Sequence, residues 1–266
     1  MTRIAVTGAA GRMGQRIIQV LRETADLELG AAVEHGGHPR LGEDAGLVAG
    51  GAPSGVTISD SLEMALTGCP ILIDFTTPEA TLANLAVCRR LGTAMVIGTT
   101  GLANDQKDWI QEAAGTIPIV FAPNMSIGVN VCLRILKDLT RILGGDFEAE
   151  IVELHHNRKK DAPSGTALRM GEVIAEAAGR DFAEAAVFSR HGLIGARKKE
   201  EIGLQTVRGG DIVGEHTVYF IGMGERIELS HRAMTRDMFA RGAVRAAQWL
   251  AGKKAGLYDM QDVLGI

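Results

Sequence analysis

The sequence of 266 residues contains few aromatic residues, few cysteines and no excess of basic residues. Its 7 Phe, 2 Trp and 2 Tyr are too few for the aromatic platforms on which proteins stack single-stranded nucleic acids. Lys and Arg number 28 against 32 Asp and Glu, so the formal charge is -4 and the basic surface of a nucleic-acid-binding protein is missing. No apolar run approaches the roughly 18 residues that a membrane-spanning helix needs. These absences argue against a nucleic acid or a membrane as the partner of this protein.

The three cysteines are also scattered. Cys69, Cys88 and Cys132 lie in apolar surroundings and show no CxxC spacing. This pattern predicts buried structural thiols rather than a redox or metal site, because free cysteine is commonly buried. An odd number of cysteines without a secretory signal indicates a reducing, cytoplasmic setting.

The first half of the chain alternates strand-like and helical segments. Short, continuously apolar strands separated by helices predict a parallel sheet that is covered on both faces. The expected strands are residues 4–7, 27–33, 56–58, 70–75, 94–97 and 117–121. The expected helices are residues 11–22, 78–91 and 105–114.

The second half has a different pattern. Residues 200–232 hold several strand candidates with no helix between them, which predicts an antiparallel sheet. A further strand is expected over residues 147–156, and helices are expected over residues 127–143, 164–178 and 236–250. The boundary between two domains is expected near residues 124–127, after the last strand of the alternating half.

Residues 8–14, GAAGRMG, follow the first predicted strand and open the first predicted helix. In a dinucleotide site, glycines here allow a sharp turn and a close approach to the pyrophosphate, and the N–H groups at the helix start bind the phosphates. Glu34 ends the next strand, 20 residues after Gly14, where a ribose-binding acid belongs. A tight structural turn and a solvated strand end would explain each feature singly. Together they favour a dinucleotide site.

Two later loops are expected on the same side of the sheet. Residues 98–101, GTTG, and residues 122–125, APNM, each follow a predicted strand. Ligands of open α/β sheets bind beyond the carboxyl ends of the strands. Each loop singly is also explained as an ordinary turn, but their shared position favours contact with the ligand.

The run HHNRKKDAPSGTAL, residues 155–168, concentrates two His, one Arg and two Lys within six residues. A solvated surface loop could have this composition. The run ends, however, in Pro-Ser-Gly-Thr at a helix start, where hydroxyl and N–H groups can bind an anion such as a carboxylate. A metal site at His155 and His156 is disfavoured, because adjacent strand residues point to opposite faces and no other His or Cys is suitably spaced.

This run closely resembles the signature of the bacterial dihydrodipicolinate reductases, E-x-H-H-x-x-K-x-D-x-P-S-G-T-A. The matching residues are Glu153, His155, His156, Lys159, Asp161 and residues 163–167. The resemblance covers nearly the whole chain. It includes GAAGRMG at 8, DFTTPE at 74, GTTG at 98, APNMSIGVN at 122, VRGGDIVGEHTV at 207 and ELSHRAMTRDMFARGAVRAAQWL at 228.

The resemblance implies an α/β fold with two domains. A Rossmann-like dinucleotide-binding domain is expected over residues 1–126, completed by a C-terminal helix within residues 236–266. A mixed α+β domain with an open sheet, for substrate binding and oligomerisation, is expected over residues 127–235. Family members are commonly homotetramers, so a cytoplasmic homotetramer is expected here.

The resemblance further implies an NADH- or NADPH-dependent oxidoreductase of lysine and diaminopimelate biosynthesis. The substrate would be a small cyclic dicarboxylate, 4-hydroxy-tetrahydrodipicolinate, reduced to tetrahydrodipicolinate by hydride at C4 of the cyclic imine with loss of water. His155 and Lys159 would be the catalytic acid–base pair. The implied substrate-binding residues are His156, Ser164, Gly165 and Thr166. The predicted cofactor-binding residues are Gly8, Ala9, Ala10, Gly11, Arg12, Met13, Glu34, His35, Gly98, Thr99, Thr100, Ala122, Pro123, Asn124 and Met125.

The residue after Glu34 departs from a common family pattern. Many members have Arg there, which can meet the 2′-phosphate of NADPH, whereas this chain has His35. Glu34 suits the ribose hydroxyls of NADH and repels a 2′-phosphate, and histidine side chains are generally mostly neutral at pH 7. Arg12 offers a further charge from the glycine loop. Dual cofactor use is therefore expected, with NADH at least as good as NADPH, unless His35 is only an exposed loop residue.

Two other classes of protein stay open. Another nicotinamide dehydrogenase, acting for example on aspartate or homoserine, explains the glycine loop but not Lys159 followed by the DAPSGTA segment. A dinucleotide-sensing regulator would keep residues 8–14 and lose the pair of His155 and Lys159, whereas this chain retains both.

Overall fold

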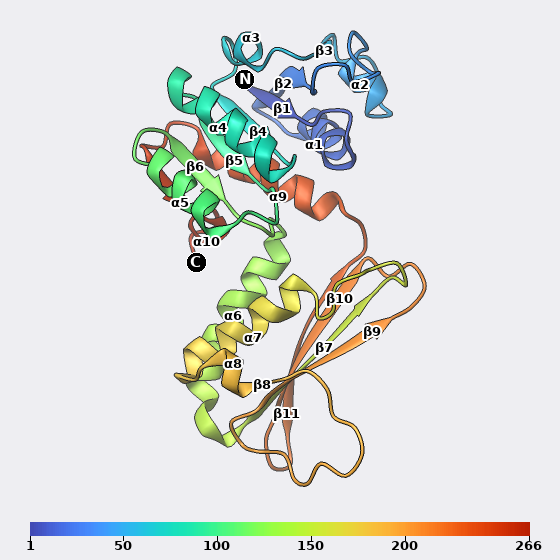
Figure 1. The fold of residues 1–266 in the computed structure, drawn as a ribbon, viewed down its shortest axis with the longest axis vertical. Coiled ribbons are helices and arrows are strands. Elements are labelled where there is room, and N and C mark those ends of the chain that lie inside the picture. The colour runs from blue at the N-terminus through green and yellow to red at the C-terminus, as the bar shows by residue number, and fades with distance from the viewer. The chain divides into compact units, whose positions relative to one another are not determined.

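The computed structural model of the chain describes all 266 residues, which form two compact units. Unit 1 consists of Met1–Ile127 and Asp237–Ile266, and unit 2 consists of Gly128–Arg236. Each unit has its own sheet (Figure 1). No helix in the structure has both the length and the apolar character that crossing a membrane requires.

The sheet of unit 1 has seven strands in the order β12-β6-β5-β4-β1-β2-β3, and all of its pairs are parallel. The strands are β1 (Thr2–Thr7), β2 (Leu27–Val33), β3 (Ile58–Ser59), β4 (Ile71–Asp74), β5 (Ala94–Ile97), β6 (Pro118–Phe121) and β12 (Gly256–Tyr258). Because β1 pairs with β2 on one side and β4 on the other, the strand order reverses at β1. Open α/β sheets bind ligands beside such a switch point.

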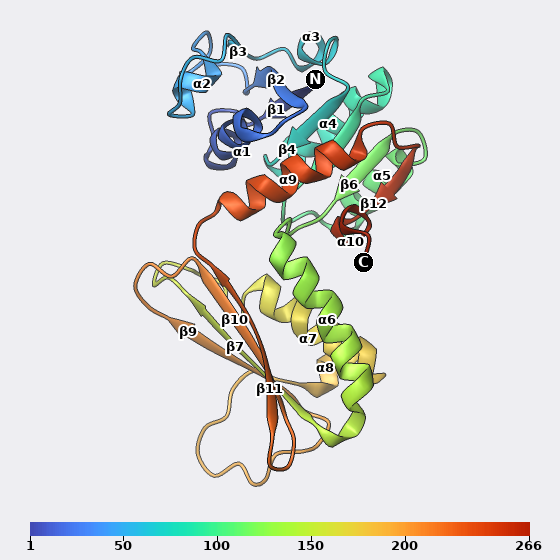
Figure 2. The ribbon, with the colours of Figure 1, turned by 180° about the vertical axis from the view of Figure 1, so that it is seen from behind.

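Helices cover both faces of this sheet (Figures 1 and 2). They are α1 (Arg12–Glu23), α2 (Ala45–Val48), α3 (Leu62–Leu66), α4 (Pro78–Leu91), α5 (Asn104–Ala113), α9 (Asp237–Leu250) and α10 (Met260–Leu264). Successive strand residues point to opposite faces. Ile4 and Val6 therefore share one apolar cluster with α1 and α9, whereas Ala5 shares another with α4 and α5. The predicted parallel sheet with two covered faces is confirmed.

The sheet of unit 2 is mixed, in the order β11-β10-β7-β9-β8. The strands are β7 (Glu148–His155), β8 (Ala186–Val187), β9 (Ile202–Arg208), β10 (Gly214–Ile221) and β11 (Arg226–Ala233). The helices are α6 (Ile127–Leu143), α7 (Gly165–Ala178) and α8 (Phe182–Ala185). Burial alternates residue by residue along β7 and β10, because α6 and α7 cover only one face of the sheet (Figures 1 and 2).

The antiparallel sheet expected over residues 200–232 is only partly correct. β10 is antiparallel to both β7 and β11, but β9 pairs with β7 in parallel. β7 lies between β9 and β10, so β9 does not pair with the strand that follows it in the sequence. Strand candidates that are adjacent in sequence do not reveal an interposed third strand, and this is why the prediction failed.

Smaller differences occur at short elements. The strand expected over residues 56–58 is the two-residue β3, Ile58–Ser59. The helices α2, α3, α8 and α10 each have only four or five residues, too few to show a helical period in the sequence. Cys69, Cys88 and Cys132 are all buried and unbridged, as predicted.

Candidate active site

The carboxyl ends of the central strands of unit 1 lie level with one another. Thr7 of β1 is in register with Asp74 of β4, and Asp74 is in register with Ile97 of β5. The loops that follow these strands therefore leave the sheet along one edge. The structure thus places residues 8–14 and 98–101 at the same edge.

The glycine loop, residues 8–14, has a shape that other residues cannot adopt. Gly8 has φ of +62°, in the left-handed region that favours glycine. A Cβ on Gly14 would lie 2.1 Å from the carbonyl oxygen of Gly8. α1 begins at Arg12 with Gly11 as its N-cap, and no side chain caps the helix start. The loop therefore presents backbone N–H groups and a partial positive charge to an anion.

Glu34, directly after β2, is tied to this loop. The backbone N–H of Ala10 donates to Oε1 of Glu34 across 2.9 Å. The rings of His35 and His38 pack edge to face with centroids 5.2 Å apart, so two histidines stand beside the carboxylate. Sequence analysis missed His38, although its spacing of three residues from His35 was a usable signal.

Glu34, His35 and His38 also have donor types of a transition-metal site, with one donor atom from each within 4.8 Å of the others. The Nδ1 atoms of both rings already face backbone groups, at 3.0 Å from the Gly36 oxygen and 3.2 Å from the Arg40 nitrogen. Only the Nε2 atoms of the two rings remain for a ligand.

Asp74, at the end of β4, is a buried carboxylate that organises the neighbouring loops. Thr99 and Thr81 donate to Oδ1 across 3.0 and 2.9 Å, and Asn84 donates to Oδ2 across 2.6 Å. The side chain of Thr99 is therefore directed into the protein, so it can contact a cofactor only through its backbone. Sequence analysis quoted this aspartate within the DFTTPE motif without assigning it a role.

The remaining predicted cofactor residues differ in their exposure. Gly98 is required by packing, since a Cβ there would lie 2.1 Å from the Phe75 ring. Thr100 and Pro123 are exposed, whereas Met125 belongs to the core. Exposed members of these loops can touch a ligand directly, and buried ones shape the loop.

In unit 2, the alternation of β7 directs Glu153 and His155 to the helix-covered face. Only 1% of the Glu153 side chain is exposed. One carboxylate oxygen lies 2.5 Å from Nδ1 of His155, and the other accepts the backbone N–H of Ser164 across 3.0 Å. Both terminal nitrogens of Arg208 donate to this carboxylate across 2.8 Å. Glu153 thus joins the predicted catalytic histidine to the start of α7.

The start of α7 is the predicted anion site. Ser164 is its N-cap, and its Oγ accepts the N–H of Ala167 across 3.1 Å. The same Oγ lies 2.8 Å from Nε2 of His216, a buried residue of β10. Gly165 is exposed and a Cβ there would meet nothing within 4 Å. Hydrogen bonds therefore hold Ser164 in place, whereas the exposed Gly165 leaves space for a ligand at the helix start.

The predicted Lys159 lies in the loop between β7 and α7. Its Nζ donates to Oδ2 of Asp161 across 2.8 Å, and this hydrogen bond lowers the pKa of the Asp161 carboxyl. Arg208 also donates to the backbone oxygen of Asp161 across 2.8 Å. His156 instead accepts from the N–H of Arg158 across 3.2 Å. Arg208 therefore links Glu153 to the lysine-bearing loop.

Burial and charge pairing set the protonation of this cluster. Burial raises the pKa of the Glu153 carboxyl, but hydrogen bonds from Arg208 and His155 more than offset it, so the pKa lies below its ordinary value. Burial lowers the pKa of His155, and Glu153 opposes this effect only in part. Burial also lowers the pKa of His216 to about 4. An ionised carboxylate thus stands beside two histidines that are neutral at pH 7.

Arg208 and His216 are the functional candidates that sequence analysis missed. Both lie within the VRGGDIVGEHTV segment, whose residues carried no assigned role. In the sheet, Arg208 is in register with His155 and His216 is in register with Glu153. Only strand pairing brings these residues to the HHNRKK segment.

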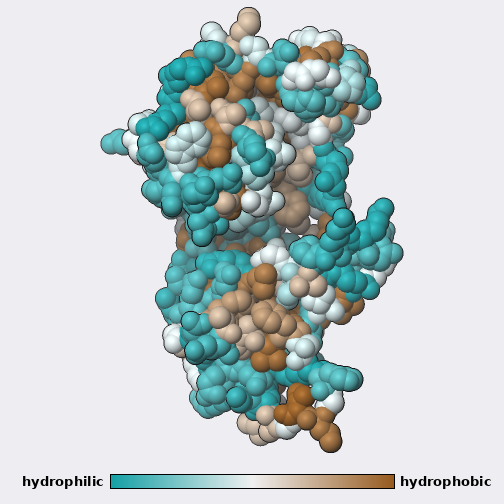
Figure 3. All heavy atoms as spheres, viewed as in Figure 1, coloured by the Kyte–Doolittle hydropathy of each residue, from teal (hydrophilic) through white to brown (hydrophobic).

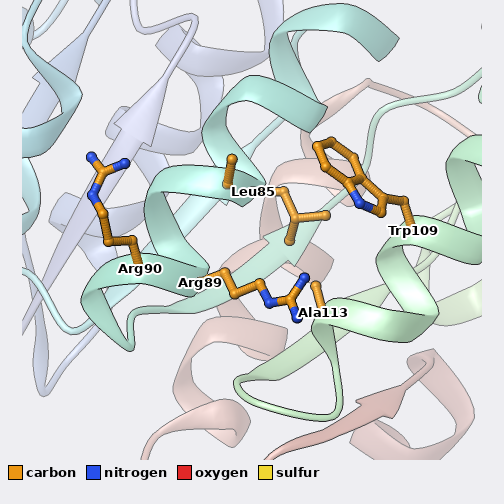
Figure 4. A pocket seen from close by; sticks show the side chains of 6 residues that line it. Leu85, Arg89, Arg90, Trp109 and Ala113 are labelled. Carbon is orange, nitrogen blue, oxygen red and sulfur yellow. The ribbon is translucent and has the colours of Figure 1, made fainter.

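A cavity of about 390 Å³ lies elsewhere in unit 1, between α4 and α5 (Figure 4). Trp109 and Leu85 line it, together with Arg89 and Arg90. These residues belong to the C-terminal halves of their helices, so they lie at the edge of the sheet opposite the glycine loop. Arg89 pairs with Glu112 across 3.0 Å. The cavity contains no acid, base or nucleophile for catalysis, and none of the predicted site residues lines it.

The chain matches two family models in succession. The model described as dihydrodipicolinate reductase, N-terminus, matches residues 2–125, and the C-terminus model matches residues 128–264. Relatives named 4-hydroxy-tetrahydrodipicolinate reductase from Geobacter sulfurreducens and Geobacter metallireducens are 64% and 63% identical. Each match covers 100% of this chain and 100% of the relative.

Solved structures show a similar fold. A dipicolinate-bound dihydrodipicolinate reductase from Paenisporosarcina sp. TG-14 is 25% identical with a TM-score of 0.76, over 98% of each chain. An amine dehydrogenase from Mycobacterium smegmatis, 14% identical, has a TM-score of 0.58 over 96% of this chain and 94% of its own. The second likeness concerns the fold alone.

Proposed function

Because the chain belongs to the dihydrodipicolinate reductase family, we propose that it reduces 4-hydroxy-tetrahydrodipicolinate to tetrahydrodipicolinate with loss of water, in lysine and diaminopimelate biosynthesis. One observation carries the assignment of the reaction to unit 2. A single buried carboxylate, that of Glu153, contacts both His155 and the N–H at the start of α7. A proton-transfer group and an anion-binding site are thereby held together, as reduction of a carboxylate-bearing imine requires.

We assign proton transfer to His155 and Lys159. Reduction of a conjugated imine develops negative charge on the substrate, which a cationic acid stabilises and then neutralises. The helix start of α7 holds one substrate carboxylate through its N–H groups, so that the ring is oriented toward the acids. The proposed substrate-binding residues are His156, Ser164, Gly165 and Thr166.

The residues of unit 1 fit a dinucleotide. The start of α1 has no side-chain cap, and the cradle at Gly14 has no room for a Cβ. Glu34 is held beside the loop, where it would accept a ribose hydroxyl. When bound, a reduced nicotinamide supplies the hydride. The residues proposed to hold it are Gly8, Ala9, Ala10, Gly11, Arg12, Met13, Glu34, His35, Gly98, Thr99, Thr100, Ala122, Pro123, Asn124 and Met125.

A coupled assay tests the proposed reaction. The synthase product, formed from pyruvate and aspartate semialdehyde, is added to the protein with NADH or NADPH, and the absorbance of the reduced nicotinamide is followed. A substrate-dependent decrease is expected. Turnover of an aspartate or homoserine substrate instead, or no turnover at all, would favour the other dehydrogenases or a regulator.

Replacing Thr166 by valine tests the anion site. The variant keeps the shape of the side chain but removes its hydroxyl at the start of α7, so one hydrogen bond to the substrate carboxylate is lost. We expect KM for the cyclic substrate to rise about tenfold, as a lost charge-assisted hydrogen bond predicts. KM for the cofactor should change little. Equal increases in both constants, measured by steady-state kinetics, would contradict the assignment.

Replacing His35 by arginine tests the choice of cofactor. We propose that the unmodified protein uses both, with NADH at least as good as NADPH near pH 7.5. The arginine variant should favour NADPH selectively, by about tenfold for one added contact of ~1.4 kcal/mol to the 2′-phosphate.

The ratio of kcat/KM for the two cofactors is the measurement. His38→Arg is a companion variant, because His38 packs against His35. It shows whether the cofactor preference depends on an arginine at position 35 or on an added positive charge anywhere in this loop. A strong NADPH preference that persists unchanged in the His35 variant would place the selectivity elsewhere.

We also propose a homotetramer assembled through the uncovered face of the unit 2 sheet. Val152 and Leu154 alternate with the residues that face the helices, and so point to the other face. Ile221 of β10 is in register with Glu148, shares this face and is 39% exposed, and Figure 3 shows apolar residues at the surface of unit 2 among hydrophilic ones. Apolar residues on an uncovered sheet face are typical of a subunit interface. A monomeric mass by light scattering would contradict this proposal.

We further propose that the protein works in the cytoplasm. Its three cysteines are all free and buried, which is typical of proteins in reducing compartments.

A further inference from the structure

Glu153 belongs to the family signature, yet it neither transfers a proton nor binds the substrate in the function proposed above. Its side chain is almost fully buried but carries a charge. Burying a carboxylate is costly unless it is paired and hydrogen-bonded. Four residues supply those partners, and they are His155, Ser164, Thr206 and Arg208. They come from β7, the start of α7 and β9.

We infer that Glu153 is a positioning residue, which keeps the proton of neutral His155 on Nδ1 so that Nε2 is the atom that exchanges a proton with the substrate. The inference rests on the proposed function. It specifies that Nε2 of His155 is the atom that exchanges the proton, and that the Glu153 carboxylate determines this.

The protonation of Glu153 determines the tautomer of His155. Arg208 donates two hydrogen bonds to the carboxylate, and together with His155 it keeps the pKa of Glu153 below its ordinary value. An ionised carboxylate can only accept hydrogen bonds. Nδ1 of His155, 2.5 Å away, must therefore carry a proton. The lone pair of the neutral ring is then on Nε2.

The surroundings of Nε2 agree with this role. Nε2 of His155 has no hydrogen-bond partner in the protein and is not among the buried unpaired atoms. The position beside it is Gly214, where a Cβ would lie only 2.8 Å from Nε2. The glycine thus leaves room that any other residue would fill.

The carboxylate also fixes the distance between the imidazole of His155 and the start of α7. Oε2 faces His155 and Oε1 accepts the N–H of Ser164. Because a carboxylate is planar and rigid, and Arg208 holds both of its oxygens, the imidazole and the helix start cannot move independently. Positioning of this kind is a large part of what an active site contributes.

The groups that face His155 come from several elements. Glu153 precedes it on β7, Arg208 faces it from β9, and Lys159 follows in the next loop. The His216 ring of β10 packs edge to face against it, with centroids 5.2 Å apart. Glu153 is the only anion among them, so its removal should make protonation of His155 harder.

Glu153→Gln is the decisive variant. Its amide oxygen can still accept from Ser164 and Arg208 on the Oε1 side. The amide NH2 then faces Nδ1 of His155, donates to it and moves the ring proton to Nε2. In a catalytic triad, the same replacement behind a histidine costs about 10⁴ in kcat because the wrong tautomer forms.

We expect kcat of Glu153→Gln to fall on the order of 10²-fold, while KM for the cyclic substrate changes less than about threefold because the Ser164 acceptor is kept. The limb of the kcat–pH profile that reports His155 should shift to lower pH. ¹⁵N NMR of histidine in the substrate-free protein should show the neutral His155 proton on Nδ1 in the unmodified protein and on Nε2 in the variant.

Glu150→Gln is the matched control. Glu150 precedes Glu153 on the same strand and is likewise clamped by arginine, with Arg190 donating to both oxygens across 2.9 Å. It lies on the opposite face, away from His155. Its replacement should lower stability without changing the His155 tautomer or the pH profile.

Arg208→Gln is a second variant, and it should shift the pH profile in the opposite direction to Glu153→Gln. It leaves the negative charge of Glu153 less compensated, so protonation of His155 becomes easier and the pH limb should shift upward.

An unchanged tautomer together with an unchanged pH profile in Glu153→Gln would overturn the inference, even if that variant were less stable or slower. Because the NMR measurement needs no substrate, it stands apart from the assay of the proposed reaction, whose failure would appear in the unmodified protein.

Discussion

The Lys159→Ala enzyme is expected to turn over on the order of 10² times more slowly than the unmodified protein, or more slowly still, because a general acid is lost. Lys159 is partly buried, with 19% of its side chain exposed, and Asp161 holds its Nζ across 2.8 Å. This pairing keeps the ammonium group in one place. His155→Ala should have an effect of similar size, since both residues are proposed to transfer protons in the same reaction.

The affinity for the cofactor should change little in these variants, because neither residue belongs to the loops of unit 1. Lys160→Ala is the control, since Lys160 is an exposed neighbour of the same type. Single-turnover and steady-state rates with either nicotinamide check the prediction. Near-normal turnover of Lys159→Ala would show that another group completes protonation.

Gly14→Ala is expected to have the second large effect, on cofactor binding. The added Cβ would lie 2.1 Å from the Gly8 oxygen and 2.7 Å from the Ala9 Cα, and both are backbone atoms. The glycine loop must therefore open, which pulls its N–H groups away from the pyrophosphate. We expect KM for the cofactor to rise at least about tenfold, and the protein to lose about 1–3 kcal/mol of stability as in other overpacked sites.

Gly145→Ala separates this effect from a general cost of adding a methyl group. Gly145 is exposed, and a Cβ there would meet only the Lys199 side chain, no nearer than 3.8 Å. Thermal unfolding and cofactor titration of the two variants give the comparison. If Gly14→Ala bound the cofactor as tightly as Gly145→Ala, the loop would not be the phosphate site.

The ends of helices that depend on short segments of the sequence were predicted correctly. α4 begins at Pro78 and ends before Gly92, which has φ of +70°, because proline suits a helix start and glycine suits its end. α7 begins directly after Ser164, whose hydroxyl caps it. Propensities, caps and apolar periods act over a few residues, so they can be read without the fold.

The sequence identified only some of the residues of the candidate active site. The signature identified His155 and Lys159 as candidates, and the same signature contained Glu153 without revealing its partners. Arg208 contacts Glu153, and His216 contacts Ser164, from strands that lie more than fifty residues later in the sequence. No local pattern distinguishes a partly buried arginine that binds a carboxylate through both terminal nitrogens, such as Arg208, from an exposed one.

The sequence by itself thus determined the parallel sheet, the glycine loop, the capped start of α7 and the family. Only the tertiary structure decided that β9 runs parallel to β7 and that β12 adds to the edge of the unit 1 sheet beside β6. It alone decided that one carboxylate joins His155 to the start of α7. The reason is physical, since strand pairing and buried charge depend on which distant segments meet, and that choice is made by the whole core.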